Sequence, residues 1–416
     1  MSSEFKKLYE LDSIYDLKKA SLLHVSDNGV DYKINFEWLV RGVDLLSTAG
    51  GGGTDAETIR NIPVIVSEIS DGEVLVYNAT TQIFENRPMA VVPVEPDPGA
   101  EPYGIIWDTQ TDTYLRTGSA DYTQAQAKMR RCLVNTNGSV NYYLHGMDST
   151  FKVDGTSGSN LTGADGNVMV EIPKFYVKYT TIGNNRSIEI STAPTVGFTV
   201  HPAFMKAGVE VPYRYYRAYQ GSKVGSKIMS IAGATPTMYT DITAARVDAV
   251  ANGTGWHLTD WNLINAVRTL MVVELGTLKT NSVLGNGATV TAATGQSNSY
   301  GNRSSNILDT GFMSYRGIEN FYSGAENEII DGININENGE VFTNSIYTTF
   351  TKDVYTGNYI DTGITLPTST GYIKNMHISN KGFIPTEVGG SSASYVTDEY
   401  SYASTQSFSG TSGITF

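Results

Sequence analysis

The chain has 416 residues, enough for two or three folded units, and only 17% of them are charged. Its net charge of −13 leaves no stripe of lysine and arginine to displace counterions from a phosphate backbone, so we expect no nucleic-acid partner. No segment approaches about 18 uncharged apolar residues, and the first residues lack an apolar signal stretch. We therefore expect synthesis in the cytosol without membrane insertion.

The first 49 residues predict a small module. Apolar runs at 22–25 and 30–34 flank an Asn-Gly pair, the strongest short signal for a β-hairpin. Asn35 can cap a helix that runs through Leu46. A unit of this size buries little core of its own, so we expect it to need neighbours or copies of itself for stability.

A four-glycine break at 50–53 separates this module from a second one at 54–90. Short apolar runs at 64–66, 73–77 and 82–85, separated by turn residues, predict a small β meander. Residues 91–102 are rich in proline and predict a stiff, extended joint.

From residue 103 the pattern predicts one large unit with both helices and strands. A hairpin is expected at 105–108 and 113–116, a helix-like stretch at 124–133, and a clear strand at 168–178. The helix-like stretch contains the only cysteine, Cys132, which we interpret as a small buried residue.

Two longer helices follow in the sequence of this unit. Thr240 or Asp241 begins one that runs to Val250, and Thr259 begins another that Gly276 ends. The second helix has a wide apolar face, so we expect it to pack against a sheet. We therefore predict an α+β fold.

Seven segments, in order, resemble the C-terminal heads of phage tail-fibre and receptor-binding proteins: 103–108, 140–144, 165–176, 201–204, 253–261, 314–320 and 382–385. These heads share a C-type lectin-like fold with the variable proteins of diversity-generating retroelements and with formylglycine-generating-type enzymes. The residues that carry the resemblance most clearly are Trp107, Trp256, His257, Trp261, Tyr315, Arg316 and Glu319.

The resemblance implies a protein of the virion tail. Residues 1–49 would attach to other tail proteins, 54–90 would act as a spacer, 91–102 as a joint, and 103–416 as a C-type lectin-like mixed α+β head. A homotrimer is implied, bound to a glycan or a protein of the host surface. Such heads have further strands after 382–385, so we expect this head to be trimmed or to lack its last part.

Aromatic and polar residues of the late loops are the receptor contacts that we expect: Tyr395, Asp398, Tyr400, Tyr402 and Phe408. Arg316 and Glu319 predict a charged pair that fixes a turn. An oxygen-rich run at 331–338 could hold Ca²⁺, but it lacks the terminal glutamate of an EF-hand and favours a turn.

No catalytic pattern stands out in the sequence. The five histidines lack metal-ligand spacing, so we expect no metal, no cofactor and no enzyme activity. Glu326 and Glu328 could serve glycoside hydrolysis, although such pairs are common on solvated loops. Two alternatives therefore stay open: a structural tail or collar protein, and a depolymerase of capsule polysaccharide.

Overall fold

The structure is a computed structural model of the whole chain. It describes the backbone of six strands before residue 89, and then residues 101–239, 241–288, 291–307, 311–322, 329–344, 349–369, 371–390 and 401–402. The chain divides into two compact units, Met1–Asp97 and Pro98–Phe416. The division falls inside the Pro-rich segment 91–102. The helix expected after Asn35 lies at 36–46, outside the described residues. The finer division into attachment module and spacer stays a prediction.

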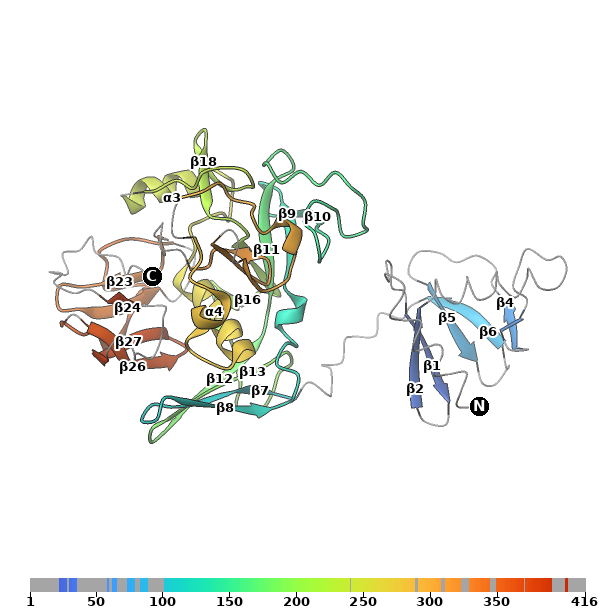
Figure 1. Ribbon diagram of the computed structural model, residues 1–416, viewed down its shortest axis with the longest axis horizontal. Coiled ribbons are helices and arrows are strands. Elements are labelled where there is room, and N and C mark those ends of the chain that lie inside the picture. The colour runs from blue at the N-terminus through green and yellow to red at the C-terminus, as the bar shows by residue number, and fades with distance from the viewer. Residues whose placement is uncertain are drawn as a thin grey trace. The chain divides into compact units, whose positions relative to one another are not determined.

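The described strands of the first unit form two small sheets (Figure 1). Strands β1 (Leu22–Asp27) and β2 (Val30–Asn35) pair antiparallel and leave only Asn28 and Gly29 between them, which confirms the predicted hairpin. The second sheet has the order β3-β4-β6-β5 and consists of Thr58–Ile59, Ile62–Ile65, Ile83–Pro88 and Glu73–Asn78. Because β4 and β6 run parallel, the predicted meander is wrong.

The second unit, which we call the head, is largely β. Strands make up 39% of the structure and helices 14%, so the predicted α+β class is wrong. The described residues contain three α-helices: α3 (Ile242–Val250), α4 (Trp261–Leu275) and α5 (Thr280–Leu284). In the Gly-, Ser-, Thr- and Asn-rich part of the chain after residue 277, the described residues form many short antiparallel strands. No helix in the described residues is long and apolar enough to cross a membrane.

A five-stranded sheet of order β14-β12-β13-β7-β8 forms one side of the head. Its strands are Thr199–Val200, Tyr176–Ile182, Asn185–Ser191, Tyr103–Asp108 and Thr113–Gly118. Tyr103, Ile105 and Trp107 alternate along β7 and are fully buried, as a strand with one face on the core requires. β7 and β8 confirm the hairpin expected at 105–116.

A four-stranded sheet of order β10-β9-β11-β17 carries the features discussed below. Its strands are Val140–Tyr143, Arg130–Val134, Asn167–Pro173 and Tyr213–Arg217. The helix expected at 124–133 is wrong: only the 3-10 turn η1 (Gln126–Lys128) is helical, and the residues after it pair with β10 and β11. The strand expected at 168–178 is two strands, β11 and β12. Cys132 is buried, as predicted.

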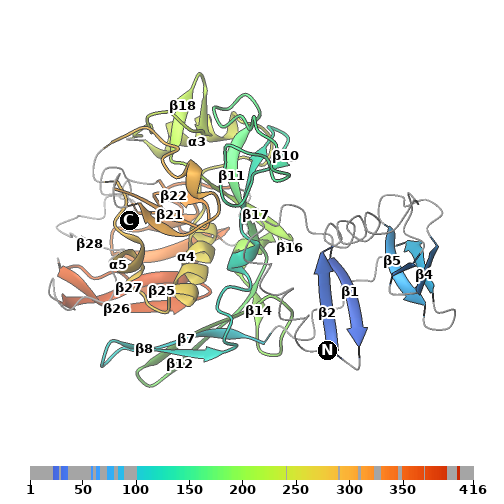
Figure 2. The same ribbon diagram turned by 45° about the vertical axis from the view of Figure 1, so that its right-hand side comes forward.

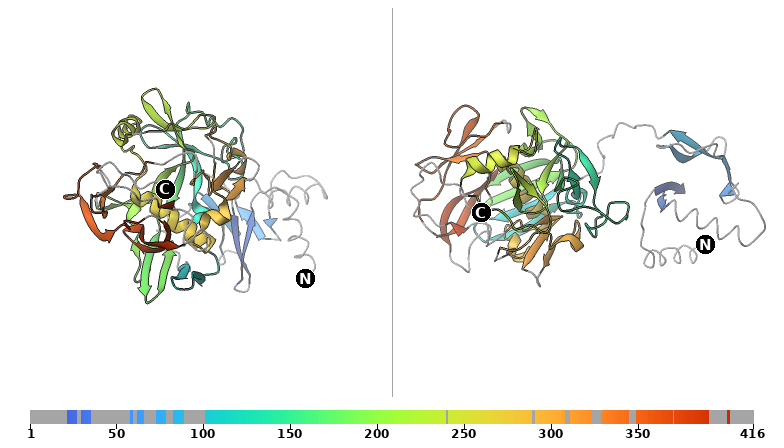
Figure 3. Two further views of the ribbon diagram at one scale, coloured as in Figure 1. Left: turned by 60° about the vertical axis from the view of Figure 1, so that its left-hand side comes forward. Right: turned by 90° about the horizontal axis from the view of Figure 1, so that it is seen from above.

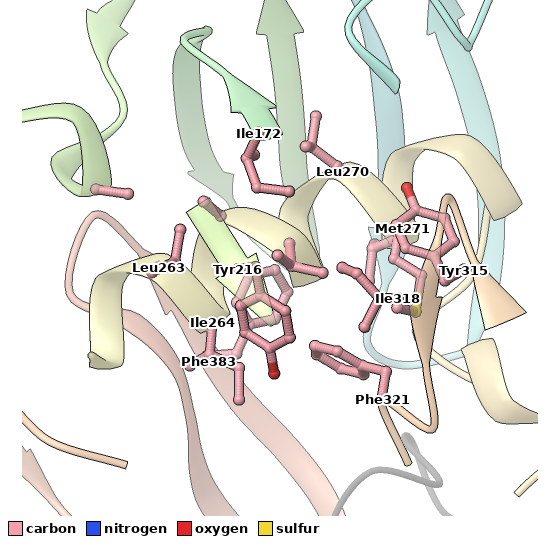
Figure 4. Packing of buried hydrophobic residues seen from close by; sticks show 14 of the residues in the cluster. Ile172, Tyr216, Leu263, Ile264, Leu270, Met271, Tyr315, Ile318, Phe321 and Phe383 are labelled. Carbon is pink, nitrogen blue, oxygen red and sulfur yellow. The ribbon is translucent and has the colours of Figure 1, made fainter. Parts of the chain in front are cut away.

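Helix α4 forms the centre of the head. Thirteen of its fifteen residues, Trp261 to Val273, are buried. The Asp260 side chain caps the helix by accepting a hydrogen bond from the Leu263 amide, one residue after the predicted cap, and Gly276 ends it at φ 74° as predicted. Strands lie around α4 in every view (Figures 2 and 3). In Figure 4 its apolar side chains meet those of β11, β17 and β27.

Shorter antiparallel sheets make up the rest of the described head. They are β15 (Met205–Lys206) with β16 (Val209–Glu210), β18 (Gly221–Val224) with β19 (Lys227–Ser230), β20 (Ser305–Ile307) with β21 (Phe312–Tyr315) and β22 (Ile318–Glu319), β23 (Ile333–Ile335) with β24 (Glu340–Asn344) and β25 (Tyr359–Thr365), and β26 (Gly371–Ser379) with β27 (Gly382–Gly390) and β28 (Ser401–Tyr402). Two 3-10 turns, η2 (Pro202–Phe204) and η3 (Asn298–Tyr300), complete the described part.

The oxygen-rich run at 331–338 forms the end of one of these hairpins. The Asn336 side-chain oxygen accepts hydrogen bonds from the amides of Asn338 and Glu340, so the run closes the turn between β23 and β24. The described residues contain no group of three or more His, Cys, Asp or Glu that could hold a metal ion.

Candidate functional site

The residues that carry the sequence resemblance are mainly core residues. Trp107, Trp261 and Tyr315 are fully buried. Arg316, at φ 47° in the turn between β21 and β22, forms an ion pair with Glu274 near the end of α4. Glu319 instead accepts hydrogen bonds from the amides of Gly295 and Ser297. The predicted Arg316–Glu319 pair is therefore wrong, because the turn directs the two side chains to different partners.

The late loops expected to contact a receptor fall mostly outside the described residues. Tyr395, Asp398, Tyr400 and Phe408 are among those that the structure does not describe. The backbone of Tyr402 lies in β28, opposite Gly371 of β26. These five contacts stay a prediction.

The outer face of the four-stranded sheet brings together aromatic and charged side chains. Cross-strand pairing places Arg130, Glu171 and Tyr215 in one row and Cys132, Met169 and Arg217 in the next. Neighbouring positions on the opposite face, such as Leu133, Val170 and Tyr216, belong to the core. We call Arg130, Tyr143, Glu171, Tyr213 and Tyr215 the sheet-face site.

Hydrogen bonds and ring contacts hold the sheet-face site together. The Arg130 guanidinium lies 3.6 Å from the centre of the Tyr143 ring and donates to Glu171 Oε1 at 2.9 Å. Tyr143 donates to the other oxygen of Glu171 at 2.8 Å. The rings of Tyr213 and Tyr215 are 5.3 Å apart. Burial and the bond to Glu171 raise the pKa of Tyr143 to about 12, so it stays a neutral donor.

Cys132 lies on the same side of the sheet, beneath these larger side chains. Burial is the main cause that raises the pKa of its thiol, and Glu171 adds to the effect while Arg130 opposes it. A buried thiol with a raised pKa is a poor nucleophile. Cys132 therefore serves as a small packing residue.

A pocket adjoins the sheet-face site and shares Tyr215 with it. It has a volume of about 170 Å³ and lies among β11, β17, the β18–β19 hairpin, α3 and the loop before α4. Figures 1 and 2 both show β18 beside α3 at one end of the head. Rings and methionines dominate the side chains that line it: Met169, Tyr215, Tyr216, Met229, Met238, Tyr239, Trp256 and His257.

The walls of the pocket are fixed by hydrogen bonds to neighbouring segments. Trp256 donates its indole N–H to the Thr136 carbonyl at 3.0 Å. Tyr239 donates to Asp248, which also accepts from Lys223. These bonds hold the aromatic rings in place before any ligand arrives, which lowers the entropic cost of binding.

His257 lies at the floor of the pocket, just before α4. Burial lowers its pKa, although Asp260 acts in the opposite direction. Its Nδ1 lies 2.6 Å from the Leu258 carbonyl oxygen, so the neutral ring carries its proton on Nδ1 and donates it there. Asp260 is fully buried; burial would raise its pKa, but Arg214, which donates to it at 2.5 Å, holds the pKa below its ordinary value.

The side chains that line the pocket are largely aromatic or apolar. Among the described residues that line it there is no aspartate or glutamate, while glycoside hydrolysis requires a pair of carboxylates. Rings, methionine side chains, amides and one arginine, Arg217, are the groups that it presents. Such groups contact apolar or planar parts of a ligand.

Comparisons with known proteins add no identity. No protein-family model matches the chain, and no curated protein is significantly similar to it in sequence. The resemblance to tail-fibre heads therefore stays a prediction.

Of the predicted motif residues, Trp256 and His257 line the pocket. No pattern in the sequence points to the other residues that line it. The signal that could have found the sheet-face site is the run Tyr213–Arg217, in which tyrosine and arginine occupy both faces of one strand. Aromatic residues and arginine are enriched at the centre of interfaces, so a strand with both on its outer face is a candidate contact surface.

Proposed function

We propose that this chain is a tail-fibre or adhesin protein whose head binds the host surface without covalent chemistry. The observation that carries the proposal is the sheet-face site together with the adjoining pocket. One partly exposed sheet face combines Tyr213, Tyr215, Tyr143 and Arg130 with a preformed pocket whose described lining has no carboxylate.

Protein surfaces that recognise partners have this composition. Tyrosine, tryptophan, methionine and arginine are enriched in the centre of interfaces, and lysine, glutamate and aspartate are depleted. Tyrosine also gives a large contact area at little entropic cost because it has only two rotatable side-chain bonds. Tyr213 is 45% exposed, so its ring is available to a partner.

The division of the chain into two units suits the same role. In this proposal the unit Met1–Asp97 attaches the protein to the tail, and the head presents the site. Three copies in one fibre would place three sites near the host surface, so that weak single sites give strong attachment.

Cell adsorption by the purified full-length protein tests the proposal. Tyr213→Ala is expected to weaken adsorption by about 30-fold, the loss typical of a central aromatic contact. The matched control is Leu115→Ala on β8, which removes an exposed apolar side chain from the other sheet. Tyr402→Ala tests the surface that the sequence predicts.

Each outcome separates two explanations. Adsorption that is lost in Tyr213→Ala and kept in Leu115→Ala supports the sheet-face site. Adsorption that is lost only in Tyr402→Ala places the contact on the late loops instead. A wild-type protein that adsorbs to no cell would support a structural tail protein, and reducing ends released from host polysaccharide would support a depolymerase.

A further inference from the structure

We propose that the pocket receives one apolar side chain of a protein, so that the receptor is a polypeptide and not a glycan. This inference rests on the proposed function and names the ligand class of the same site. The apolar wall of the pocket, its polar groups and its size each support this inference.

Methionines form much of the apolar wall of the pocket. Met169, Met229 and Met238 come from three different segments and line one pocket, together with Ala245 and Ala249 of α3. Methionine side chains are flexible and polarizable, so they adapt to apolar groups of different shape. A wall of this kind recognises branched or aromatic side chains.

Two polar side chains of the lining, those of Asn252 and Ser230, are already bonded within the protein. The Asn252 amide donates to the Ile228 carbonyl at 2.7 Å and accepts from Asn167. The Ser230 hydroxyl donates to the Val168 carbonyl at 2.6 Å.

Two further polar side chains of the lining differ from these. The Thr237 hydroxyl oxygen accepts a hydrogen bond from the Lys223 amide. Gln220 makes no hydrogen bond within the described residues through its side chain, so it is available to the backbone of a bound peptide. A sugar would need many more partners for its hydroxyls, and unmade hydrogen bonds of buried polar groups are costly.

The volume of the pocket matches one side chain. An apolar cavity of about 150 Å³ accepts a benzene ring, and pockets for small-molecule ligands usually exceed about 300 Å³. The volume of about 170 Å³ therefore suits a single leucine, methionine or phenylalanine side chain. The tyrosines of the sheet-face site would then surround the anchor and exclude water, as the residues around an interface hot spot do.

Methyl-group NMR on the full-length protein with ¹³C-labelled methionine tests the inference. The probes are N-acetyl-L-leucinamide and N-acetyl-L-phenylalaninamide, compared with methyl α-D-glucopyranoside and N-acetylglucosamine, all at millimolar concentration. We expect the amides to shift the signals of Met169, Met229 and Met238, and the sugars to leave them unchanged. The inference would be overturned if only the sugars shifted these methionine signals, or if none of the four probes shifted them.

Two substitutions at equally exposed methionines, one in the pocket and one outside it, serve as test and control. Met238→Glu places a charge at the edge of the pocket and should weaken amide binding about tenfold or more. Met147→Glu makes the same change on a distant loop and should leave binding unchanged, since Met147 and Met238 are 52% and 53% exposed. Equal losses in both variants would contradict a role for the pocket.

Host cells separate the inference from the proposed function. If the protein adsorbs to cells, proteinase treatment of the cells should abolish adsorption and periodate oxidation of their glycans should not. The opposite result would leave the proposed function standing and overturn the protein ligand. Amide binding without any adsorption would instead overturn the proposed function.

Discussion

We predict that acid destabilises the head through the protonation of His201. His201 is 2% exposed, and its Nδ1 accepts a hydrogen bond from the Ala203 amide at the start of η2. Its ring lies 5.0 Å from that of Phe175. Burial lowers the pKa of His201 to about 3, although Asp260 acts in the opposite direction. The imidazole is therefore neutral in the folded head.

The sign and size of the effect follow from this pKa. In the unfolded chain the His201 side chain has the ordinary pKa of 6.5, so it binds a proton below that pH, whereas the folded head does so only near pH 3. The free energy of unfolding therefore has its full value above pH 6.5 and falls as the pH decreases toward about 3. The full difference corresponds to about 5 kcal/mol, of which about 2 kcal/mol is lost between pH 7 and pH 5.

Urea unfolding followed by tryptophan fluorescence at pH 7 and pH 5 measures this loss. His201→Asn keeps an acceptor for the Ala203 amide but does not titrate, so it should lose about 2 kcal/mol less than the parent on acidification. His145→Asn is the matched control, since His145 Nδ1 accepts from the Met147 amide on a half-exposed loop. A variant His201→Asn with the full loss of the parent would refute the reasoning.

Two further predictions concern Asp260 at the start of α4 and Gly382 of β27, which lies against the Trp261 indole. Asp260→Ala should destabilise the head by about 3–5 kcal/mol because it leaves Arg214 buried without its partner, whereas Asp241→Ala, which removes only the cap of α3, should cost clearly less in the same urea assay. Gly382→Ala should lower the free energy of unfolding by about 1–3 kcal/mol, because Gly382 has φ 107° and a methyl group would lie 2.7 Å from the Trp261 indole of α4. Gly357→Ala is the control, since its φ is 69° and the space around it is open, and it should lower the stability less when both variants are compared by thermal unfolding.

The elements with strong local signals could be predicted from the sequence. The Asn28-Gly29 hairpin, α3, α4 and the β7–β8 hairpin follow from turn residues, caps and hydrophobic periodicity. The stretch 124–133 could not, since its apolar residues fit a helix as well as a strand. Pairing with β11 decides the matter, and that partner lies more than thirty residues away in the sequence.

The site was harder to predict than the fold because it depends on which face of a strand meets the core. The Tyr213–Arg217 run contains three tyrosines and two arginines, and the sequence alone does not say which of them point outward. The register with β11 settles this by placing Tyr215 opposite Glu171 and Tyr216 opposite Val170. A shift of one residue would exchange the two faces completely.

The same alternation explains why the proposed site is rigid. Arg214, between two outward tyrosines, points into the core and forms an ion pair with Asp260 at the start of α4. Asp331 fixes the same segment from the other side, because its carbonyl accepts the Trp261 amide and its carboxylate pairs with Arg246 of α3. The loop that supplies the floor of the pocket is thus held at two buried aspartates, through the carboxylate of Asp260 and the backbone carbonyl of Asp331. A floor fixed in this way keeps the aromatic rings in position while the methionines of the wall adapt to a ligand, so each site can select one side chain, and several copies together supply the strength of attachment.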